Sequence, residues 1–201
     1  MISVTGLRLV RLYLLSRRVP AVLGMLVVCA AGLHLILHWT PTAGDYARQL
    51  PLIIVAAAAA VVGAGLRSPF DEAERATGLR LPVLRGLSAV GLVAAGFGAL
   101  AAGAVDARLS EGDVGLLRDL AGLVGVTLIA AVFGSGGLAW MGTIGYLCLA
   151  VAGIGLGWTT PWLWPARPVL DTGAALSATA ALVVGLLAVV LRGTRESPVL
   201  S

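Results

Sequence analysis

The sequence predicts an all-α integral membrane protein, with six transmembrane helices in a single domain covering residues 1–201. Composition is the first observation, because 59% of the 201 residues are hydrophobic and only 12% are charged, whereas a soluble domain carries about 25% charged residues. The second observation is the distribution of the charged residues along the chain. The charges cluster between long apolar runs, each close to the ~20 residues that a helix needs to cross a bilayer. These runs do not alternate, and backbone in lipid must satisfy its own hydrogen bonds, so helices are predicted in place of a barrel.

The N-terminal segment 1–18 contains four arginines among leucines. Three of them, Arg8, Arg11 and Arg18, fall in one sector of a helical wheel. This pattern predicts a helix that lies in the membrane interface before the first span. A plain basic flank that anchors the first span is the alternative.

Six apolar runs follow, and each is predicted to span the membrane once. A glycine-rich turn of only four residues, 134–137, joins the fourth and fifth runs, so these two spans form a tight hairpin. The segment 158–171 between the fifth and sixth runs is rich in proline and tryptophan. A short acidic loop is predicted before the fourth span, and its last two charges overlap the start of that span. Its charged residues are Asp106, Glu111, Asp113 and Asp119 with Arg108 and Arg118. The predicted spans are residues 19–39, 50–66, 86–105, 116–133, 138–157 and 172–191.

The arginines predict the orientation of the spans. Ten of them fall on the side of the two termini and four on the other side, so the positive-inside rule places both termini in the cytoplasm. Four tryptophans fall on the opposite side and are predicted to be interfacial aromatics. The bias towards Arg, Ala, Gly, Leu and Val is typical of a GC-rich bacterial genome, so a bacterial plasma membrane is expected. The four tryptophans are Trp39, Trp158, Trp162 and Trp164.

The residue types that are absent exclude several function classes. All 14 basic residues are arginine, so the chain has neither the lysine of a P-loop nor a lysine for a Schiff base. If ATP drives this protein, another polypeptide binds it. The spans are predicted to hold almost no ionisable groups, which argues against proton or ion coupling. Because the arginines lie at the ends of apolar runs, their expected partners are lipid headgroups, not nucleic acid.

Small groups of residues within or beside the spans are candidate sites. His34 and His38 share one helix face but have no third ligand nearby in the sequence, so polar groups at the interface are expected in place of a metal site. Cys29 and Cys148 are each predicted to be small buried apolar residues without a disulfide. Arg167 and Asp171 are spaced to pair across one helical turn and to cap the sixth span.

Glycines are frequent in the third and fifth predicted spans. Small residues let membrane helices approach closely. This close approach would occur either within one chain or at a seam between two copies. The glycines are Gly91, Gly96, Gly98 and Gly103 in the third span and Gly142, Gly145, Gly153 and Gly155 in the fifth.

The most charged segment of the chain, residues 67–85, lies between the second and third spans on the predicted cytoplasmic side. Ser68 followed by Pro69 is a helix start, acidic residues occupy the first turn, and Gly78 is a stop signal. The segment therefore predicts a short cytoplasmic helix over residues 69–77. An amphipathic loop helix without a partner is the alternative.

A family resemblance rests on this segment. The residues Glu74-Arg75-Ala76-Thr77-Gly78 resemble the Glu-Arg-x-x-Gly element of the coupling helix in type 2 ABC-exporter permeases. Pro82 to Arg85 is similar to the proline and basic residue that follow it there. Six spans with cytoplasmic termini, an interfacial N-terminal helix and a broken, partly re-entrant element between the fifth and sixth spans are also similar to that family.

The resemblance implies a permease subunit that moves an amphipathic or lipid-like substrate. In that family the coupling helix docks onto a separate ATPase subunit, so ATP and Mg would be bound by that partner and no cofactor by this chain. It also implies a second permease copy or a homologous permease as a further partner, with no catalytic residue and no metal ligand here. The residues implied to contact the ATPase are Asp71, Glu72, Glu74, Arg75 and Gly78.

Two other function classes stay open on the sequence. The first is a membrane assembly or signalling partner that transports nothing, whose cytoplasmic loop would bind something other than an ATPase. The second is a small metal or haem membrane protein that uses His34 and His38.

Overall fold

The computed structural model describes residues 19–39, 46–66, 81–105, 112–134, 139–157 and 160–192. All regular elements in these ranges are helices. Every run predicted as a span is helical, which confirms the all-α class. The predicted interfacial helix (1–18) and the predicted cytoplasmic helix (69–77) lie outside the described residues. The elements are α2 (Val19–Trp39), α3 (Tyr46–Gly65), α5 (Leu81–Gly103), α6 (Gly112–Phe133), α7 (Ala139–Gly155), the 3-10 turn η3 (Trp164–Ala166) and α8 (Thr172–Arg192).

Four of the described helices are long and apolar enough to cross a membrane. In α3 and α7 the continuous apolar part is shorter and covers Gln49–Gly65 and Ala139–Gly153. The exposed faces carry large apolar side chains, among them Val27 and Val28 on α2 and Leu187 on α8. Such faces are compatible with a membrane protein, because lipid tails do not penalise exposed leucine and valine as water does. The four long segments are Val19–Trp39, Arg85–Gly103, Val114–Phe133 and Thr172–Arg192.

Helix α5 begins five residues earlier than the predicted span. Its second residue is Pro82, and proline suits the first turn of a helix because the N–H that it lacks has no intrahelical partner there. Pro82 and Arg85 therefore belong to α5. The helix therefore begins inside the segment 67–85, five residues before the predicted start of the third span.

Helix α6 also begins before the predicted span, at Gly112. The predicted acidic loop and the predicted span 116–133 overlap at Arg118 and Asp119, and the structure places both residues inside α6, as the span predicts and the loop does not. Both are also buried, at 7% and 8% exposure. The expectation that the spans hold almost no ionisable groups therefore missed a buried arginine and a buried aspartate.

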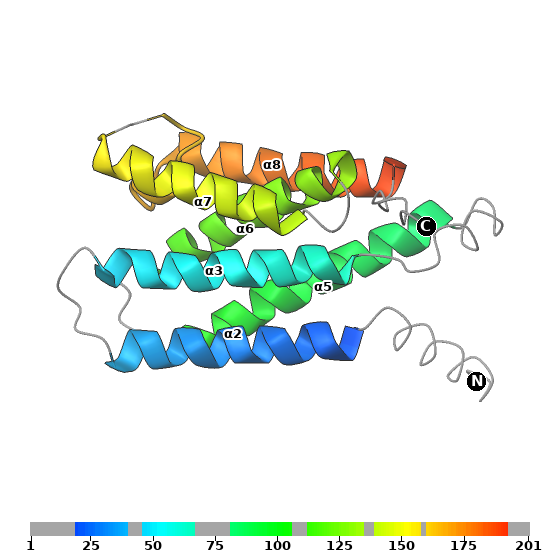
Figure 1. Ribbon diagram of the computed structural model, residues 1–201, viewed down its shortest axis with the longest axis horizontal. Coiled ribbons are helices and arrows are strands. Elements are labelled where there is room, and N and C mark those ends of the chain that lie inside the picture. The colour runs from blue at the N-terminus through cyan, green and yellow to red at the C-terminus, as the bar shows by residue number, and fades with distance from the viewer. Residues whose placement is uncertain are drawn as a thin grey trace, which may run out of the picture.

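The helices run up and down along one axis (Figure 1). Helices α2, α5 and α7 run in one direction, and α3, α6 and α8 run in the other, so their ends gather in two groups. One group contains Arg85 near the start of α5 and Arg192 at the end of α8, and we call it the arginine end. The opposite end contains the connection from α7 to α8.

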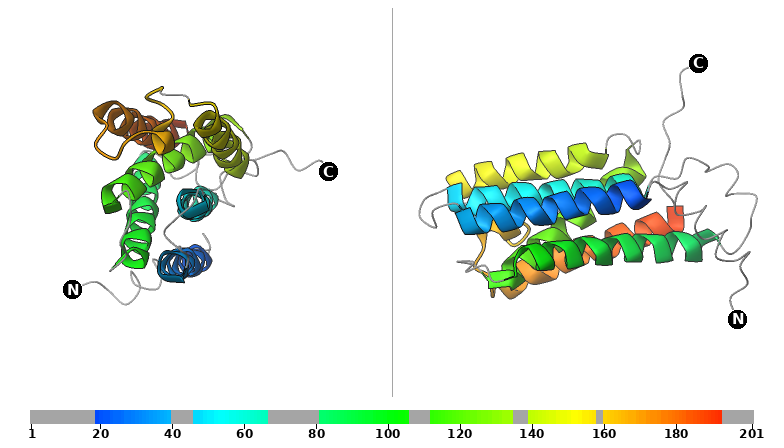
Figure 2. Two further views of the ribbon diagram at one scale, coloured as in Figure 1. Left: turned by 90° about the vertical axis from the view of Figure 1, so that its left-hand side faces the viewer. Right: turned by 90° about the horizontal axis from the view of Figure 1, so that it is seen from below.

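Helix α6 lies at the centre of the bundle and contacts α3, α5, α7, α8 and η3. Its Leu120, Leu123 and Leu128 are fully buried. The end-on view in Figure 2 shows α2 on the side away from α7 and α8, and α2 contacts α3 and α5. The hydrophobic core thus follows α6 along most of its length.

Glycine allows two helix pairs to touch backbone to backbone. A Cβ added to Gly125 of α6 would lie 2.3 Å from the main-chain carbonyl carbon of Ala181 in α8, and one added to Gly185 would lie 2.8 Å from the carbonyl oxygen of Gly125. Likewise, a Cβ on Gly103 of α5 would lie 2.5 Å from the carbonyl oxygen of Ala30 in α2. No larger residue fits these positions without moving a helix.

The glycines predicted to mediate close packing fall into two groups. Gly96, Gly103 and Gly142 each face a residue of another helix in the same chain, which confirms packing within one chain at these positions. The others of that set whose surroundings are described have open space around them, with no atom within 4 Å of an added Cβ: Gly91, Gly98, Gly145 and Gly155.

Candidate functional site

The residues expected to contact an ATPase do not contribute to a described site. Asp71, Glu72, Glu74, Arg75 and Gly78 all lie outside the described residues, so the coupling helix stays a prediction. The site with the most polar contacts is at the opposite end from Arg85 and Arg192, where α7 connects to α8.

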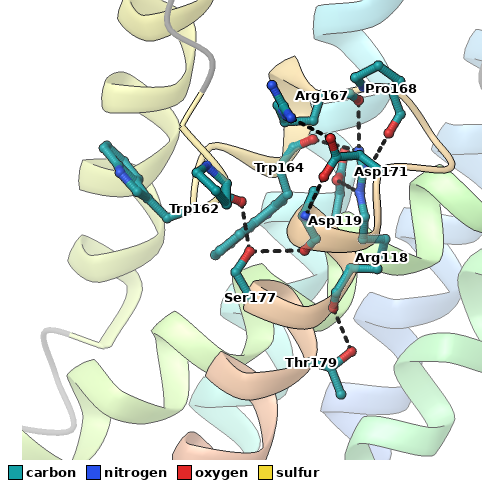
Figure 3. A network of polar contacts seen from close by, with 12 residues as sticks. Arg118, Asp119, Trp162, Trp164, Arg167, Pro168, Asp171, Ser177 and Thr179 are labelled. Carbon is teal, nitrogen blue, oxygen red and sulfur yellow. Dashed lines mark hydrogen bonds and ion pairs between the residues drawn. The ribbon is translucent and has the colours of Figure 1, made fainter.

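Residues 160–171, which we call the strap, fold back onto the ends of α6, α7 and α8 (Figure 3). Leu163 and Trp164 are buried, at 0% and 3% exposure. Backbone bonds shape the strap internally, with the Leu163 N–H on the Thr160 carbonyl at 3.0 Å and the Asp171 N–H on the Pro168 carbonyl at 3.0 Å. The strap contains three prolines, which fix φ and lack a backbone donor, so these three residues have no N–H group that needs a partner.

Arg118 reaches from α6 into the strap. Its Nη2 donates to the carbonyl of Trp164 at 2.6 Å and its Nη1 to the carbonyl of Pro168 at 2.8 Å. A longer contact joins Nη2 to the Arg167 carbonyl at 3.4 Å, and Nε pairs with Asp119 Oδ1 at 3.2 Å. The Arg118 side chain is only 4% exposed. We call these three carbonyls and the Asp119 carboxylate the carbonyl cage.

A second ion pair lies at the start of α8. The Arg167 guanidinium donates to Asp171 Oδ2, and Asp171 Oδ1 accepts the Ala174 N–H at 2.8 Å, which satisfies an otherwise unpaired donor of the first helical turn. The Ala174 hydrogen bond and the nearby Arg167 hold the pKa of the Asp171 carboxyl below its usual value. The predicted pair and cap are confirmed. However, Arg167 lies in the strap and not in a helix. The two residues are therefore brought together by a non-helical turn and not by one turn of a helix.

Trp164 is the apolar anchor of the strap. Its indole stacks on the Tyr146 ring of α7 at 4.5 Å between centroids, and it lies against Gly122 of α6, where an added Cβ would be 2.3 Å from the ring. Its Nε1 is buried and has no hydrogen-bond partner among the described residues. The prediction that Trp164 is an interfacial aromatic is therefore wrong, whereas Trp39 and Trp162 are exposed as expected; Trp158 lies outside the described residues.

All three neighbouring helices donate a side-chain hydrogen bond to a strap carbonyl. Besides Arg118 of α6, Tyr146 of α7 donates its hydroxyl to the Trp162 carbonyl at 2.9 Å. Ser177 of α8 donates to the Pro161 carbonyl at 2.7 Å. Each of α6, α7 and α8 thus satisfies at least one strap carbonyl.

A further polar contact joins α6 to α7 below the strap. The hydroxyls of Thr127 and Thr143 lie 2.5 Å apart and both side chains are buried. Thr127 also donates to the Leu123 carbonyl one turn earlier, at 2.7 Å.

The histidine pair faces outward from α2. The rings of His34 and His38 lie 4.0 Å apart, and His38 Nδ1 is 2.9 Å from the His34 carbonyl oxygen. The described part of the chain contains no group of three or more His, Cys, Asp and Glu side chains that could hold a metal ion. Of the two cysteines, Cys29 is buried as predicted, but Cys148 is exposed on α7, so its predicted burial is wrong.

The chemistry of the strap end is recognition of main-chain carbonyls by buried donors. Sequence reasoning missed this site because it counted Arg118 and Asp119 with a loop. One signal was present: the two charges are followed directly by Leu120 and an apolar run that reaches Phe133. Charges next to such a run need partners inside the protein. No family model, no curated protein and no solved structure matches the chain.

Proposed function

We propose that the chain is the permease subunit of an ATP-driven ABC exporter in a bacterial plasma membrane. The observation that carries this proposal is the Glu74-Arg75-Ala76-Thr77-Gly78 element, which lies in the sequence between the apolar helices α3 and α5. In this proposal the helix over residues 69–77 docks onto a separate ATPase, through Asp71, Glu72, Glu74, Arg75 and Gly78.

Helix directions support a six-span topology. A helix rises ~1.5 Å per residue, so the 20 residues of α3 extend about 30 Å and the 17 residues of α7 about 26 Å. Both alternate in direction with the four longer helices, and α2 begins and α8 ends at the arginine end. Because arginine concentrates on the cytoplasmic side of membrane proteins, the arginine end is cytoplasmic in this proposal and the strap end is outside.

The distribution of charge supports an amphipathic or lipid-like cargo. Between the arginine end and the strap end, the side chains that the structure describes carry no formal charge. A pathway for small ions usually keeps acidic or basic groups within the spans. The cargo would pass between two permease copies, and motion of the ATPases would reach the spans through the helix over residues 69–77.

Co-purification tests the proposal. Affinity-purified chain is expected to bring down an ATPase that has its own P-loop lysine, because this chain has no lysine. Glu74→Ala is expected to weaken that association and to reduce ATP-dependent export. The matched control is Glu196→Ala, which makes the same change in the C-terminal tail, on the same proposed side of the membrane.

Two results together would contradict the proposal: no ATPase recovered in mild detergent, and Glu74→Ala as active as the control. A partner other than an ATPase on the 67–80 segment would favour an assembly or signalling role. A metal or haem spectrum that disappears in His34→Ala would favour the redox alternative.

A further inference from the structure

The strap is tied to the bundle by side chains. Its backbone hydrogen bonds in the described residues join strap residues to one another or to the first turn of α8, as when the Ala175 N–H donates to the Asp171 carbonyl. The bonds from the helices come instead from the side chains of Arg118, Tyr146 and Ser177. The strap could therefore leave the bundle with its own turns intact.

Closure of the strap has a polar penalty. It buries Trp164 Nε1 without a hydrogen-bond partner among the described residues, and a buried unpaired donor is unfavourable. It also buries the Arg118 guanidinium, whose charge is costly to desolvate unless hydrogen bonds replace water. The closed position therefore depends on the contacts that Arg118 makes.

We propose that the strap is a lid over the ends of α6, α7 and α8, and that Arg118 is the clasp that holds it shut. Gly157, two residues after the end of α7, has φ +68°, a conformation that glycine adopts without a steric penalty, and it precedes the strap in the chain. Asp171, which caps α8, is the last residue of the strap. In the open position Leu163 and Trp164 leave the core.

The clasp requires the geometry of a guanidinium. Arg118 donates from Nε, Nη1 and Nη2 in one plane to Asp119 and to the carbonyls of the strap. A lysine ammonium is a single point charge at the end of a flexible stem and cannot place donors along these separate directions. The carbonyl cage is therefore a guanidinium-binding site that Arg118 occupies from within the same chain.

Cysteine labelling of the purified chain in detergent tests the lid. In a background with Cys29→Ala and Cys148→Ala, Leu163→Cys reports on opening because Leu163 is buried. The labelling reagent is a maleimide. Thr160→Cys, at an exposed position at the start of the strap, is the control for the intrinsic reactivity of a thiol with this reagent. Leu163→Cys is expected to react slowly when Arg118 is present, and Thr160→Cys quickly in every background.

Replacement of Arg118 should open the lid. Arg118→Ala and Arg118→Lys are each expected to raise the labelling rate of Leu163→Cys by about tenfold or more, as would follow from a shift of about 1.4 kcal/mol in the lid equilibrium. In Arg118→Ala, guanidinium chloride at millimolar concentration should restore protection because the free ion fills the carbonyl cage. Sodium chloride at the same concentration should not.

Several outcomes would overturn the proposal. They are unchanged labelling of Leu163→Cys in both Arg118 variants, rapid labelling when Arg118 is present, and failure of guanidinium to restore protection in Arg118→Ala. If Arg118→Ala is not recovered folded, as judged by helical circular dichroism, the labelling rate of Leu163→Cys in the Arg118→Lys background decides whether loss of the guanidinium opens the lid. The test uses no ATPase and no cargo, so its result is independent of the proposed export function.

Discussion

A buried guanidinium loses its hydration shell, and Arg118 replaces that shell with hydrogen bonds to Asp119 and to carbonyls of the strap. Main-chain carbonyls are available in any sequence, so only the donor side of this site is visible in the amino-acid types. Arg118 and Trp164 are 46 residues apart in the chain. Neither helical periodicity nor local spacing could pair them, and the site was therefore missed, whereas the Arg167–Asp171 pair, four residues apart, was predicted from spacing alone.

The lowered pKa of the Asp171 carboxyl predicts that the stability of the protein depends on pH. Because its folded-state pKa lies below the usual value of 3.8, its contribution is complete above that value and is lost as the pH falls through the lower folded-state pKa. Asp171→Asn keeps an oxygen for the Ala174 N–H but does not titrate. As the pH is lowered from about 6 to about 3, the thermal unfolding midpoint of the purified wild-type chain should therefore fall more steeply than that of this variant. Parallel curves would contradict the assignment.

At the scale of helices, apolar run length predicted the described elements well, because a run of about 20 apolar residues has few alternatives to a helix in lipid. The helix ends were less predictable. The start of α5 moved to Leu81 because Pro82 fits a first turn, and α6 extends back to Gly112. The sequence also could not show which face of each helix is covered: Gly96 and Gly98 are two residues apart, yet only Gly96 faces another helix.

The crossing of α6 and α8 gives a prediction about packing. Gly125→Ala places a methyl group 2.3 Å from the Ala181 backbone, so the two helices must separate, and overpacking of this kind costs about 1–3 kcal/mol. The matched control is Gly145→Ala in α7, where the same methyl group has no neighbour within 4 Å. There the better helix propensity of alanine should raise stability by up to about 1 kcal/mol. Unfolding in a detergent series measures both variants, and equal effects would contradict the described contact.

At the scale of the whole molecule, the described charges separate into a basic end and a neutral end. Arg85 and Arg192 lie at the first, where Arg192 also lies 5.3 Å above the Phe133 ring. Two arginines and two aspartates lie at the strap end. The apolar runs predicted the helices, and the arginines predicted which helix ends share one side of the membrane. The sequence could not predict that the connection from α7 to α8 would fold back into the bundle, because that depends on Gly122 leaving room for Trp164.

At this scale we predict that the strap end and the arginine end are exposed on opposite sides of the membrane. A cysteine at Thr160 should react in intact cells with a maleimide that cannot cross membranes, because the strap end lies outside in the proposed topology. A cysteine at Leu191, which is exposed at the arginine end, should react only after the cells are permeabilised. The background again carries Cys29→Ala and Cys148→Ala. Labelling of both positions from outside would contradict a cytoplasmic arginine end.

The unpaired indole N–H of Trp164 has an optical consequence. An excited indole lowers its energy by reorienting polar neighbours, and Trp164 has an apolar ring face on Tyr146 and no hydrogen-bond acceptor for Nε1 among the described residues. Its emission should therefore lie to the blue of that of exposed Trp39 and Trp162. When water reaches the ring the emission should move to the red, so the protein contains its own fluorescent reporter of whether this end is dry.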